Sequence, residues 1–151
     1  MRNILNATMT LSLWNLLHDG TIAKIAAPRH DTRLLTIEIE YLRHMFSKYG
    51  NAIIVQLDSC DVFEYQDYQN FTDEEWTQEL LTIATYEPEI LSATQNQNNT
   101  LIIGCVAGLV RTRYQSFSLT LDNGYPITIE NLKNAHQRYW EAFGNTNTVR
   151  E

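Results

Sequence analysis

The fold class is decided by residues 21–40, which read TIAKIAAPRHDTRLLTIEIE. Apolar and polar side chains alternate from Leu35 to Glu40, and this period of two is typical of a half-buried β-strand. Thr21–Ala27 has the composition of a second strand, which Pro28 closes. Because only a short polar loop separates the two strands, the segment predicts a β-hairpin.

Further strand patterns follow this hairpin along the chain. Ala52–Tyr65 is long enough for one strand or for a bent pair of strands. Polar residues interrupt its apolar face, which favours a bulge near Ser59–Asp61. Asp122-Asn123-Gly124 contains Asn-Gly, the strongest short hairpin signal. The remaining predicted strands are Glu89–Thr94, Thr100–Leu109 and Tyr114–Leu121.

A helix is predicted over residues 71–85, inserted between strands. Thr72 is a good N-cap, and Glu75, three residues later, completes a capping box. Phe71 lies where a hydrophobic staple would place it. The stripe expected to face the core consists of Trp76, Leu80 and Ile83.

A second helix is predicted at the end of the chain, with Thr128 as its N-cap and Gly144 at the position of a C-terminal cap. Residues 8–17, in contrast, fit a strand or a helical turn equally well by their spacing. The apolar stripe of the last helix consists of Ile129, Leu132, His136, Tyr139 and Phe143.

These patterns predict a single α+β domain. It is a curved antiparallel β-sheet of about six or seven strands, with an inserted helix and a C-terminal helix. The length of 151 residues and the 44% hydrophobic content suit one core. Whether the sheet is open or closed into a barrel is left undecided by the sequence.

The charge is unevenly distributed. The net charge is −7, and no Lys or Arg lies between Lys48 and Arg111, a stretch that holds ten of the eighteen acidic residues. Nucleic-acid binding is not expected, because it needs clustered Lys and Arg. The acidic stretch is either a solvated surface or a docking surface for a basic protein.

Aromatic residues lie within the same acidic stretch. Aromatic anchors inside a charged rim are typical of protein interfaces. Tyr65 and Tyr68 are the candidates, since the predicted helix accounts for Phe71 and Trp76. The predicted partner-binding residues are Asp58, Asp61, Glu64, Tyr65, Asp67, Tyr68, Asp73 and Glu74.

Few residues offer catalytic chemistry, and no nucleotide, hydrolase or metal motif is present, so no catalytic residue, cofactor or metal is predicted. His18 lies beside Asp19, and a histidine next to a carboxylate can act in acid–base chemistry. Asp19 precedes Gly20, however, and Asp before Gly is also an ordinary turn residue. Glu38 and Glu40 share one face of the predicted strand and lie about 7 Å apart. This separation is compatible with an acid–base pair, and the two residues also fit an ordinary solvated strand face. The possible pocket residues are His18, Asp19, Glu38, Glu40 and Cys60.

The compartment follows from the absence of sorting signals. No signal peptide or membrane span is recognisable, so a cytoplasmic protein without membrane association is expected. Cys60 and Cys105, the only cysteines, are expected to be buried free thiols, although a bridge between them is not excluded by the sequence.

The segment Trp14…Leu17-His18-Asp19-Gly20…Ile25, followed by the Leu35–Ile39 strand, resembles small uncharacterised bacterial proteins with an aromatic-x-x-Leu-His-Asp-Gly opening. Some of these are similar to immunity proteins, which neutralise bacterial toxins and are often small, acidic and cytoplasmic. The resemblance implies a binding function and no catalytic residues.

Two functions are therefore weighed. The first is a non-enzymatic protein-binding module that uses an acidic face, of which an immunity-type inhibitor of a basic toxin is one form. The second is a small-ligand-binding or hydrolytic α+β domain with a pocket in the sheet. Self-association into a homo-oligomer is a third possibility, through a free sheet edge or exposed aromatic residues.

Overall fold

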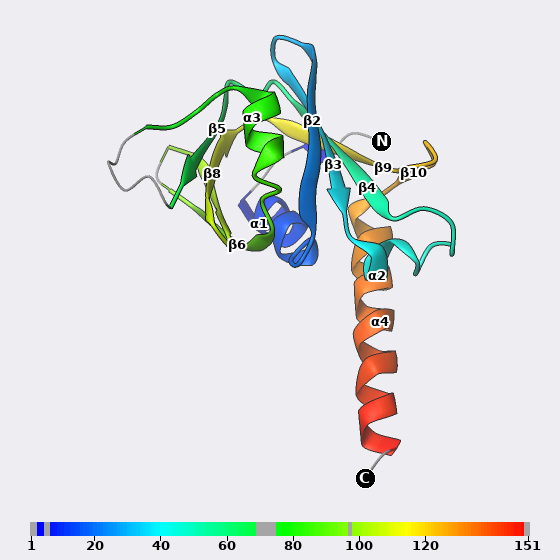
Figure 1. Ribbon diagram of the computed structural model, residues 1–151. Coiled ribbons are helices and arrows are strands. Elements are labelled where there is room, and N and C mark those ends of the chain that lie inside the picture. Colours follow the sequence, from blue (N-terminus) through cyan, green and yellow to red (C-terminus); the bar gives the residue numbers. More distant parts are fainter. Residues whose placement is uncertain (1–2, 5–6, 69–74, 97, 150–151) are drawn as a thin grey trace.

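The computed structural model describes residues 3–4, 7–68, 75–96 and 98–149 (Figure 1). It is an α+β fold with antiparallel strand pairing, as predicted, but the strands form two sheets instead of the one curved sheet expected. In chain order the elements are β1 (Asn3–Ile4), α1 (Ala7–Leu16), β2 (Thr21–Arg29), β3 (Thr32–Glu38), α2 (Glu40–Arg43), β4 (Ala52–Asp58), β5 (Val62–Asp67), α3 (Leu80–Thr85), β6 (Ile90–Gln95), β7 (Leu101–Cys105), β8 (Gly108–Arg113), β9 (Ser116–Leu121), β10 (Pro126–Ile127) and α4 (Ile129–Val149).

The first sheet contains the hairpin predicted from residues 21–40. Its order is β1-β9-β4-β3-β2, and β10 pairs with Leu119 and Thr120 of β9. Ile25 lies opposite Leu35, and Ile22 lies opposite Ile37. All four side chains are buried, so the alternation in β3 places its apolar face in the core.

The second sheet, in the order β5-β8-β7-β6, continues the first through a bend. Ser59 has φ 51° between β4 and β5, so at the position of the predicted bulge the chain passes from one sheet to the other. Backbone hydrogen bonds from Asp61 to Arg113 (3.1 Å) and from Gln115 to Asp58 (3.0 Å) carry the strand pair through the bend. At the opposite side a single bridge joins Thr21 to the residue before β6, and the described strands do not close into one barrel.

Helix α1 fills the space between the two sheets (Figure 1). Leu13 and Trp14 on this helix, and Leu17 directly after it, are completely buried. The indole N–H of Trp14 donates to the hydroxyl of Tyr114 at 2.9 Å, next to the bend. The helical interpretation of residues 8–17 is therefore correct, because a helix brings these three side chains to one face.

Helix α4 extends away from the body of the protein (Figure 1). Thr128 caps it as predicted: its hydroxyl accepts from the N–H of Asn131 at 3.1 Å, and the Asn131 side chain accepts from the N–H of Thr128 at 2.9 Å. The prediction of an end at Gly144 is wrong, since the helix runs to Val149. The glycines with positive φ are Gly50 and Gly124.

The prediction of a helix over residues 71–85 is wrong for residues 75–79, the first of this range that the structure describes. Helix α3 begins at Leu80, while Thr77 exchanges two backbone hydrogen bonds with Tyr65, of 2.9 and 3.0 Å. Of the expected stripe only Ile83 is fully buried. Pairing with β5 overrides the local helical pattern here. The proposed cap at Thr72 lies outside the described residues.

The predicted strand over Thr100–Leu109 is two strands. It turns at Val106 and Ala107, and β7 and β8 then pair with each other, with Gly104 opposite Leu109. Together with the division of residues 52–67 into β4 and β5, this raises the strand number above the six or seven expected.

Candidate functional site

Among the predicted partner-binding residues that the structure describes, Asp58 ends β4 and the others lie on or beside β5. The basic residues of β8 lie opposite β5. Glu64 is in register with Arg111, and their side chains form an ion pair. Arg113 donates three hydrogen bonds of 2.6 to 3.1 Å to the carboxylate of Asp61, and these lower the pKa of that carboxyl group. Sheet pairing thus supplies the positive charges that the linear stretch lacks.

The remaining acids of this set do not share one exposed face. Asp58 is buried and accepts a hydrogen bond from the Gln56 side chain at 3.0 Å. Asp67 is half-buried. Asp73 and Glu74 lie outside the described residues. Their part in partner binding stays a prediction, and an acidic surface has to be sought elsewhere on the molecule.

The two tyrosines of the set differ in environment. Tyr65 is 1% exposed, with its ring centroid 5.0 Å from that of Tyr86. Tyr68, just after β5, is exposed, and its N–H donates to the carbonyl of Ala107 at 3.0 Å. Tyr65 is therefore a core residue, and Tyr68 is a surface residue.

The predicted pocket residues separate into two groups at opposite ends of the β2–β3 hairpin. Glu38 pairs with Thr21, at the end of the hairpin next to His18 and Asp19. Cys60 lies at the other end, where its N–H donates to the carbonyl of Asp31 at 2.7 Å. A single pocket formed by all of these residues is thus not present.

Six aromatic side chains gather where α4 leaves the body. Trp140 lies with its ring stacked near that of His18 (6.2 Å between centroids) and edge-on to that of Tyr41 (6.4 Å). The Tyr41 hydroxyl donates to the carbonyl of His18 at 3.1 Å, which joins α2 to the turn after α1. We call this group the α4 cluster; it consists of His18, Tyr41, His136, Tyr139, Trp140 and Phe143.

Only the first part of the predicted α4 stripe is buried. Ile129 and Leu132 are core residues, together with Ala135. Beyond them Trp140 is 40% exposed and Phe143 is 50% exposed. The stripe continues past the point where the body of the protein can cover it, so its aromatic end faces solvent.

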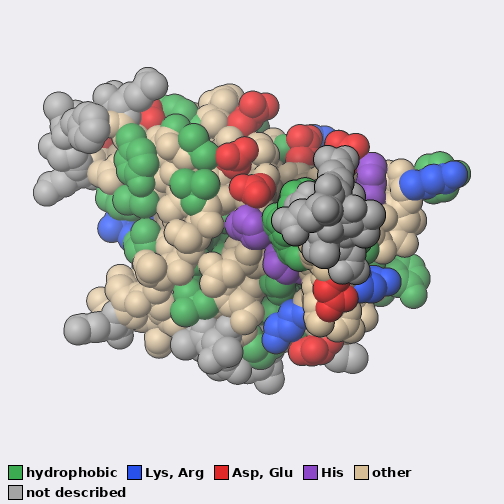
Figure 2. Space-filling model, turned by 90° about the horizontal axis from the view of Figure 1, so that it is seen from below, with side chains coloured by type: hydrophobic (Ala, Val, Ile, Leu, Met, Phe, Trp, Pro, Cys, Tyr) green, Lys and Arg blue, Asp and Glu red, His purple; other side chains and the backbone are tan. Residues whose placement is uncertain are grey.

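Acidic residues border this cluster on one side (Figure 2). The Asp19 carboxylate lies 3.7 Å from Nε2 of His18. Glu38 and Glu89 both pair with Thr21, one from β3 and one from the segment before β6, so they share a sheet face. Glu40 immediately precedes Tyr41. We call these four acids, namely Asp19, Glu38, Glu40 and Glu89, the acidic rim.

The histidine at the centre of the cluster is held in its neutral form. The indole N–H of Trp140 points to Nε2 of His136 at 3.1 Å, and this nitrogen can accept only when it carries no proton. Burial and the nearby His18 lower the pKa of His136 below its usual 6.5. In the same cluster, burial and then the Asp19 charge raise the pKa of Tyr41 to about 12.

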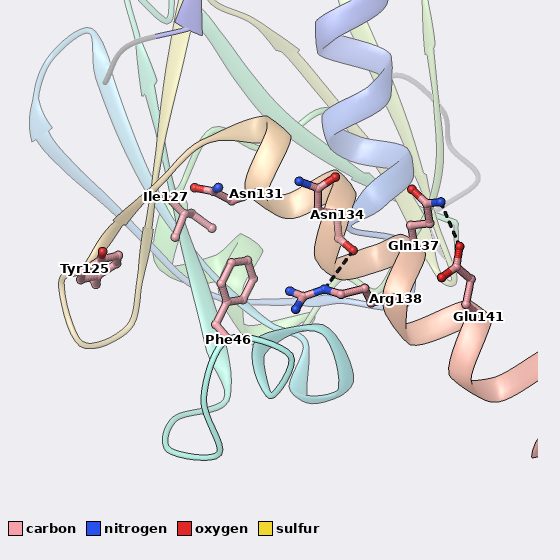
Figure 3. A pocket seen from close by; sticks show the side chains of 8 residues that line it. All are labelled: Phe46, Tyr125, Ile127, Asn131, Asn134, Gln137, Arg138 and Glu141. Carbon is pink, nitrogen blue, oxygen red and sulfur yellow. Dashed lines mark hydrogen bonds between the residues drawn. The ribbon is translucent and has the colours of Figure 1, made fainter.

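The opposite face of α4 is polar. A shallow hollow of about 710 Å³ lies there, with Asn131, Asn134 and Arg138 on the helix and Phe46 and Tyr125 across from them (Figure 3). Gln137 donates to Glu141 at 2.9 Å along the same side. Because helical residues four apart share a face, α4 has one aromatic and one polar side.

Both cysteines are buried free thiols, so the open question of a bridge is answered. Burial raises the pKa of Cys60, whose Sγ donates to the carbonyl of Val62 at 3.3 Å. Burial likewise raises the pKa of Cys105 to about 12. A thiol that stays protonated is a poor nucleophile, so the structure lends Cys60 no catalytic character.

Comparison with known proteins identifies no relative: no family model, curated protein or solved structure matches the chain. The resemblance to immunity-protein-like sequences therefore stays a prediction. Within the described ranges there is no group of three or more His, Cys, Asp or Glu residues placed to hold a metal ion. Nor does any described helix have the length and apolar character needed to cross a membrane.

Sequence reasoning missed Tyr41 and Trp140 as surface residues. The stripe of α4 was visible in the sequence, but its spacing signals a core face and carries no information on how far the body extends along the helix. Tyr41 belongs to none of the predicted helices and strands, and only the packing of α2 against α4 brings it to Tyr139, at 4.7 Å between ring centroids.

Proposed function

We propose that this protein is a non-enzymatic protein-binding module that docks a basic partner on the α4 cluster and its acidic rim. The observation that carries the proposal is the aromatic stripe of α4, which continues beyond the body with Trp140 and Phe143 half-exposed. An immunity-type inhibitor of a basic toxin would be one protein of this kind.

Energetics favour this surface as an interface. Trp and Tyr are the residues most often found to dominate binding energy, especially where neighbouring side chains exclude water from them. Trp140 is already held by His18 and Tyr41, so little side-chain entropy is lost when a partner covers it. The projecting helix leaves room for the partner to contact two sides of the cluster.

The charge of the rim determines the kind of partner. Asp19 and Glu40 have side chains that are 61% and 74% exposed, so they remain available to a partner's cations. Such a rim speeds the approach of a basic protein and disfavours an acidic one, and both effects weaken as salt screens the charges. We therefore expect a partner that carries Lys or Arg around an apolar patch.

The experiment compares three baits in one pull-down from cells of the source organism. They are the native chain, Trp140→Ala, and the matched control Asn134→Ala on the polar face of α4. A protein retained by the native chain and the control but lost with Trp140→Ala is then purified, and its affinity is measured by calorimetry. Loss of Trp140 is expected to weaken binding at least about 30-fold, which corresponds to a hot spot of about 2 kcal/mol.

The acidic rim is tested with the same purified pair. Glu40→Gln and Asp19→Asn should slow association and flatten its dependence on salt, without changing the dissociation rate much. A partner that binds Trp140→Ala as tightly as the native chain would contradict the proposal, and so would an acidic partner whose binding does not respond to salt.

A further inference from the structure

Four turns of the chain meet at the end of the β2–β3 hairpin that lies away from the α4 cluster. They are the β2–β3 turn, the β4–β5 and β8–β9 connections and the loop between β6 and β7, and they surround a hollow of about 570 Å³. This volume falls within the range of small-molecule sites. We call it the amide hollow; the lining residues used most below are Asp31, Asp61, Gln95, Asn99, Arg113 and Gln115.

Hydrogen bonds to the backbone fix the walls of this hollow. The N–H of Cys60 donates to the carbonyl of Asp31 at 2.7 Å, which joins the β4–β5 connection to the β2–β3 turn. The N–H of Asp61 donates to the carbonyl of Arg113 at 3.1 Å, which joins the same connection to the end of β8. In the β6–β7 loop the Asn96 side chain accepts from the N–H groups two and four residues later, at 3.0 and 3.1 Å. A ligand therefore meets preformed walls, and little entropy is lost in ordering them.

The buried residues of the lining are already engaged with the protein. Tyr114 and Cys60 are the two, and both lie almost entirely out of solvent. The Tyr114 hydroxyl accepts from the indole N–H of Trp14 at 2.9 Å, and Sγ of Cys60 donates to the carbonyl of Val62 at 3.3 Å. The hydrogen-bonding groups available to a ligand therefore lie on the accessible walls.

These walls carry side-chain amides that have no partner. Gln95 ends β6, Asn99 lies in the loop after it, and Gln115 lies between β8 and β9. Asn99 and Gln115 are exposed and Gln95 is half-buried. None of the three amide groups forms a side-chain hydrogen bond within the part of the chain that the structure describes. Because an amide donates through its N–H groups and accepts through its carbonyl, these walls offer both functions without any charge.

The charges around the hollow nearly cancel. Arg113 donates three hydrogen bonds to the carboxylate of Asp61, so this cation is already paired. Among the described lining residues only Asp31 adds a further charge. An anion would meet a guanidinium that is neutralised, and a cation would meet one carboxylate. The balance suits a neutral ligand that is rich in hydrogen-bonding groups.

Two of the lining residues hold a left-handed backbone although they are not glycine. The φ angle is 51° at Ser59 and 59° at Asn99. This conformation is uncommon for a residue with a side chain, and residues that adopt it gather at ligand clamps and active sites. The fold thus maintains a costly local geometry at two separate turns that border the same hollow.

We propose that the amide hollow binds a neutral pyranose sugar. A hydroxyl group donates one hydrogen bond and accepts two, which matches amide groups that do both, and the Asp31 carboxylate accepts from a further hydroxyl. The ring holds its hydroxyl groups at fixed spacing, so less entropy is lost than with an open-chain polyol. Since no exposed aromatic ring is found among the described lining residues, hydrogen bonds supply most of the affinity, and a millimolar Kd is expected.

The first test titrates the isotope-labelled full chain with D-glucose, D-galactose and D-mannose in turn. The NMR signals of the side-chain amide groups of Gln95, Asn99 and Gln115 report on the site. At least one sugar is expected to shift them with a millimolar Kd. Tetrahydropyran, the same ring without hydroxyl groups, should bind at least about tenfold more weakly, because its hydrogen bonds are lost. The absence of shifts with all three sugars would overturn the proposal, as would equal binding of tetrahydropyran.

Variants place the binding in this hollow. Gln95→Ala and Gln115→Ala each remove one amide and should each raise the Kd of the sugar about fivefold, the equivalent of one hydrogen bond. Gln78→Ala is the matched control, because Gln78 is exposed and does not line the hollow. Circular dichroism confirms that each variant is folded. Unchanged affinity in both Gln95→Ala and Gln115→Ala would overturn the assignment.

Salt and one further variant separate this site from the α4 cluster. A neutral sugar forms no ion pair, so its Kd should change by less than about twofold between about 50 and about 500 mM NaCl. Trp140→Ala should leave the Kd unchanged, so failure here is distinguishable from failure of the α4 docking proposal. A steep salt dependence would contradict a neutral ligand, and lost sugar binding in Trp140→Ala would contradict a site in the amide hollow.

Discussion

Nε of Arg43 donates a hydrogen bond of 2.7 Å to Oδ1 of Asp122, joining α2 to the turn between β9 and β10. The Arg43 side chain is 1% exposed. Charged side chains are almost never buried this completely unless they are paired, and Asp122 is the partner of Arg43. The other oxygen of Asp122 accepts the backbone N–H groups of Asn51 and Ala52 at 2.9 and 3.2 Å. This pair therefore determines where α2, and with it Tyr41, lies against α4.

The first prediction concerns this pair. Asp122→Ala leaves a buried guanidinium without its carboxylate and should destabilise the protein by about 2–4 kcal/mol in urea unfolding. Gly50→Ala should also destabilise it, because Gly50 has φ 96° and an added methyl group would meet both Asp122 and Arg43. Gly124→Ala, where φ is 89° and the added group meets nothing, separates the backbone strain from this collision.

The acid dependence of stability follows from the same carboxylate. Burial alone would raise the pKa of Asp122, but hydrogen bonds from Asn51, Arg43 and Ala52 bring it below the usual 3.8. The folded state thus holds its proton less tightly than the unfolded state. The stabilisation is complete above pH 3.8 and is lost as the pH falls through the lowered pKa. Asp122→Asn should lack this part of the acid transition in denaturation curves measured at several pH values.

The third prediction uses the neutral state of His136. Its pKa in the folded protein is lowered from 6.5, so the unfolded chain binds the proton more readily. Stability should therefore decrease as the pH falls below 6.5, and level off below the folded pKa. Protonation also removes the acceptor for Trp140, so the indole fluorescence of the folded protein should change as the pH falls through this lowered pKa. Thermal unfolding of the native chain and of His136→Gln is the measurement; an equal pH slope in both would contradict the prediction.

The fourth prediction distinguishes the buried first part of helix α4 from the α4 cluster. Leu132 is completely buried, and Leu132→Ala should cost about 2–5 kcal/mol of stability. Trp140→Ala, at a half-exposed position, should cost only about 1 kcal/mol. Urea unfolding measures both. A stability loss from Trp140→Ala as large as that from Leu132→Ala would show that the cluster is a structural part of the core rather than an available surface.

The fifth prediction tests the unpaired hydroxyl of Tyr65. Tyr65→Phe removes a buried polar atom that has no partner among the described residues, so stability should stay equal or increase by about 1 kcal/mol. A loss of more than about 1 kcal/mol would reveal a hydrogen bond that stabilises the fold, since buried hydrogen bonds contribute roughly that much.

The sequence by itself determined the local elements. Alternation from Leu35 to Glu40 predicted β3, and Thr128 marked the start of α4, because strand periodicity and N-caps depend on residues only a few positions apart. The α+β class and the bend near Ser59 followed from the same short-range rules. The buried state of Cys60 and Cys105 was predicted for the same reason, from the apolar strands around them.

Only the tertiary structure decided which of these residues meet. Sheet pairing places Arg111 beside Glu64, although 46 residues separate them in the chain, and so neutralises a stretch that reads as purely acidic. Pairing of Thr77 with Tyr65 likewise overrides a helical pattern. The end of the body along α4 leaves Trp140 and Phe143 uncovered. Each outcome depends on contacts between segments that are distant in the chain. The free energies of these contacts outweigh the local helix and strand propensities, which are what a sequence pattern reports.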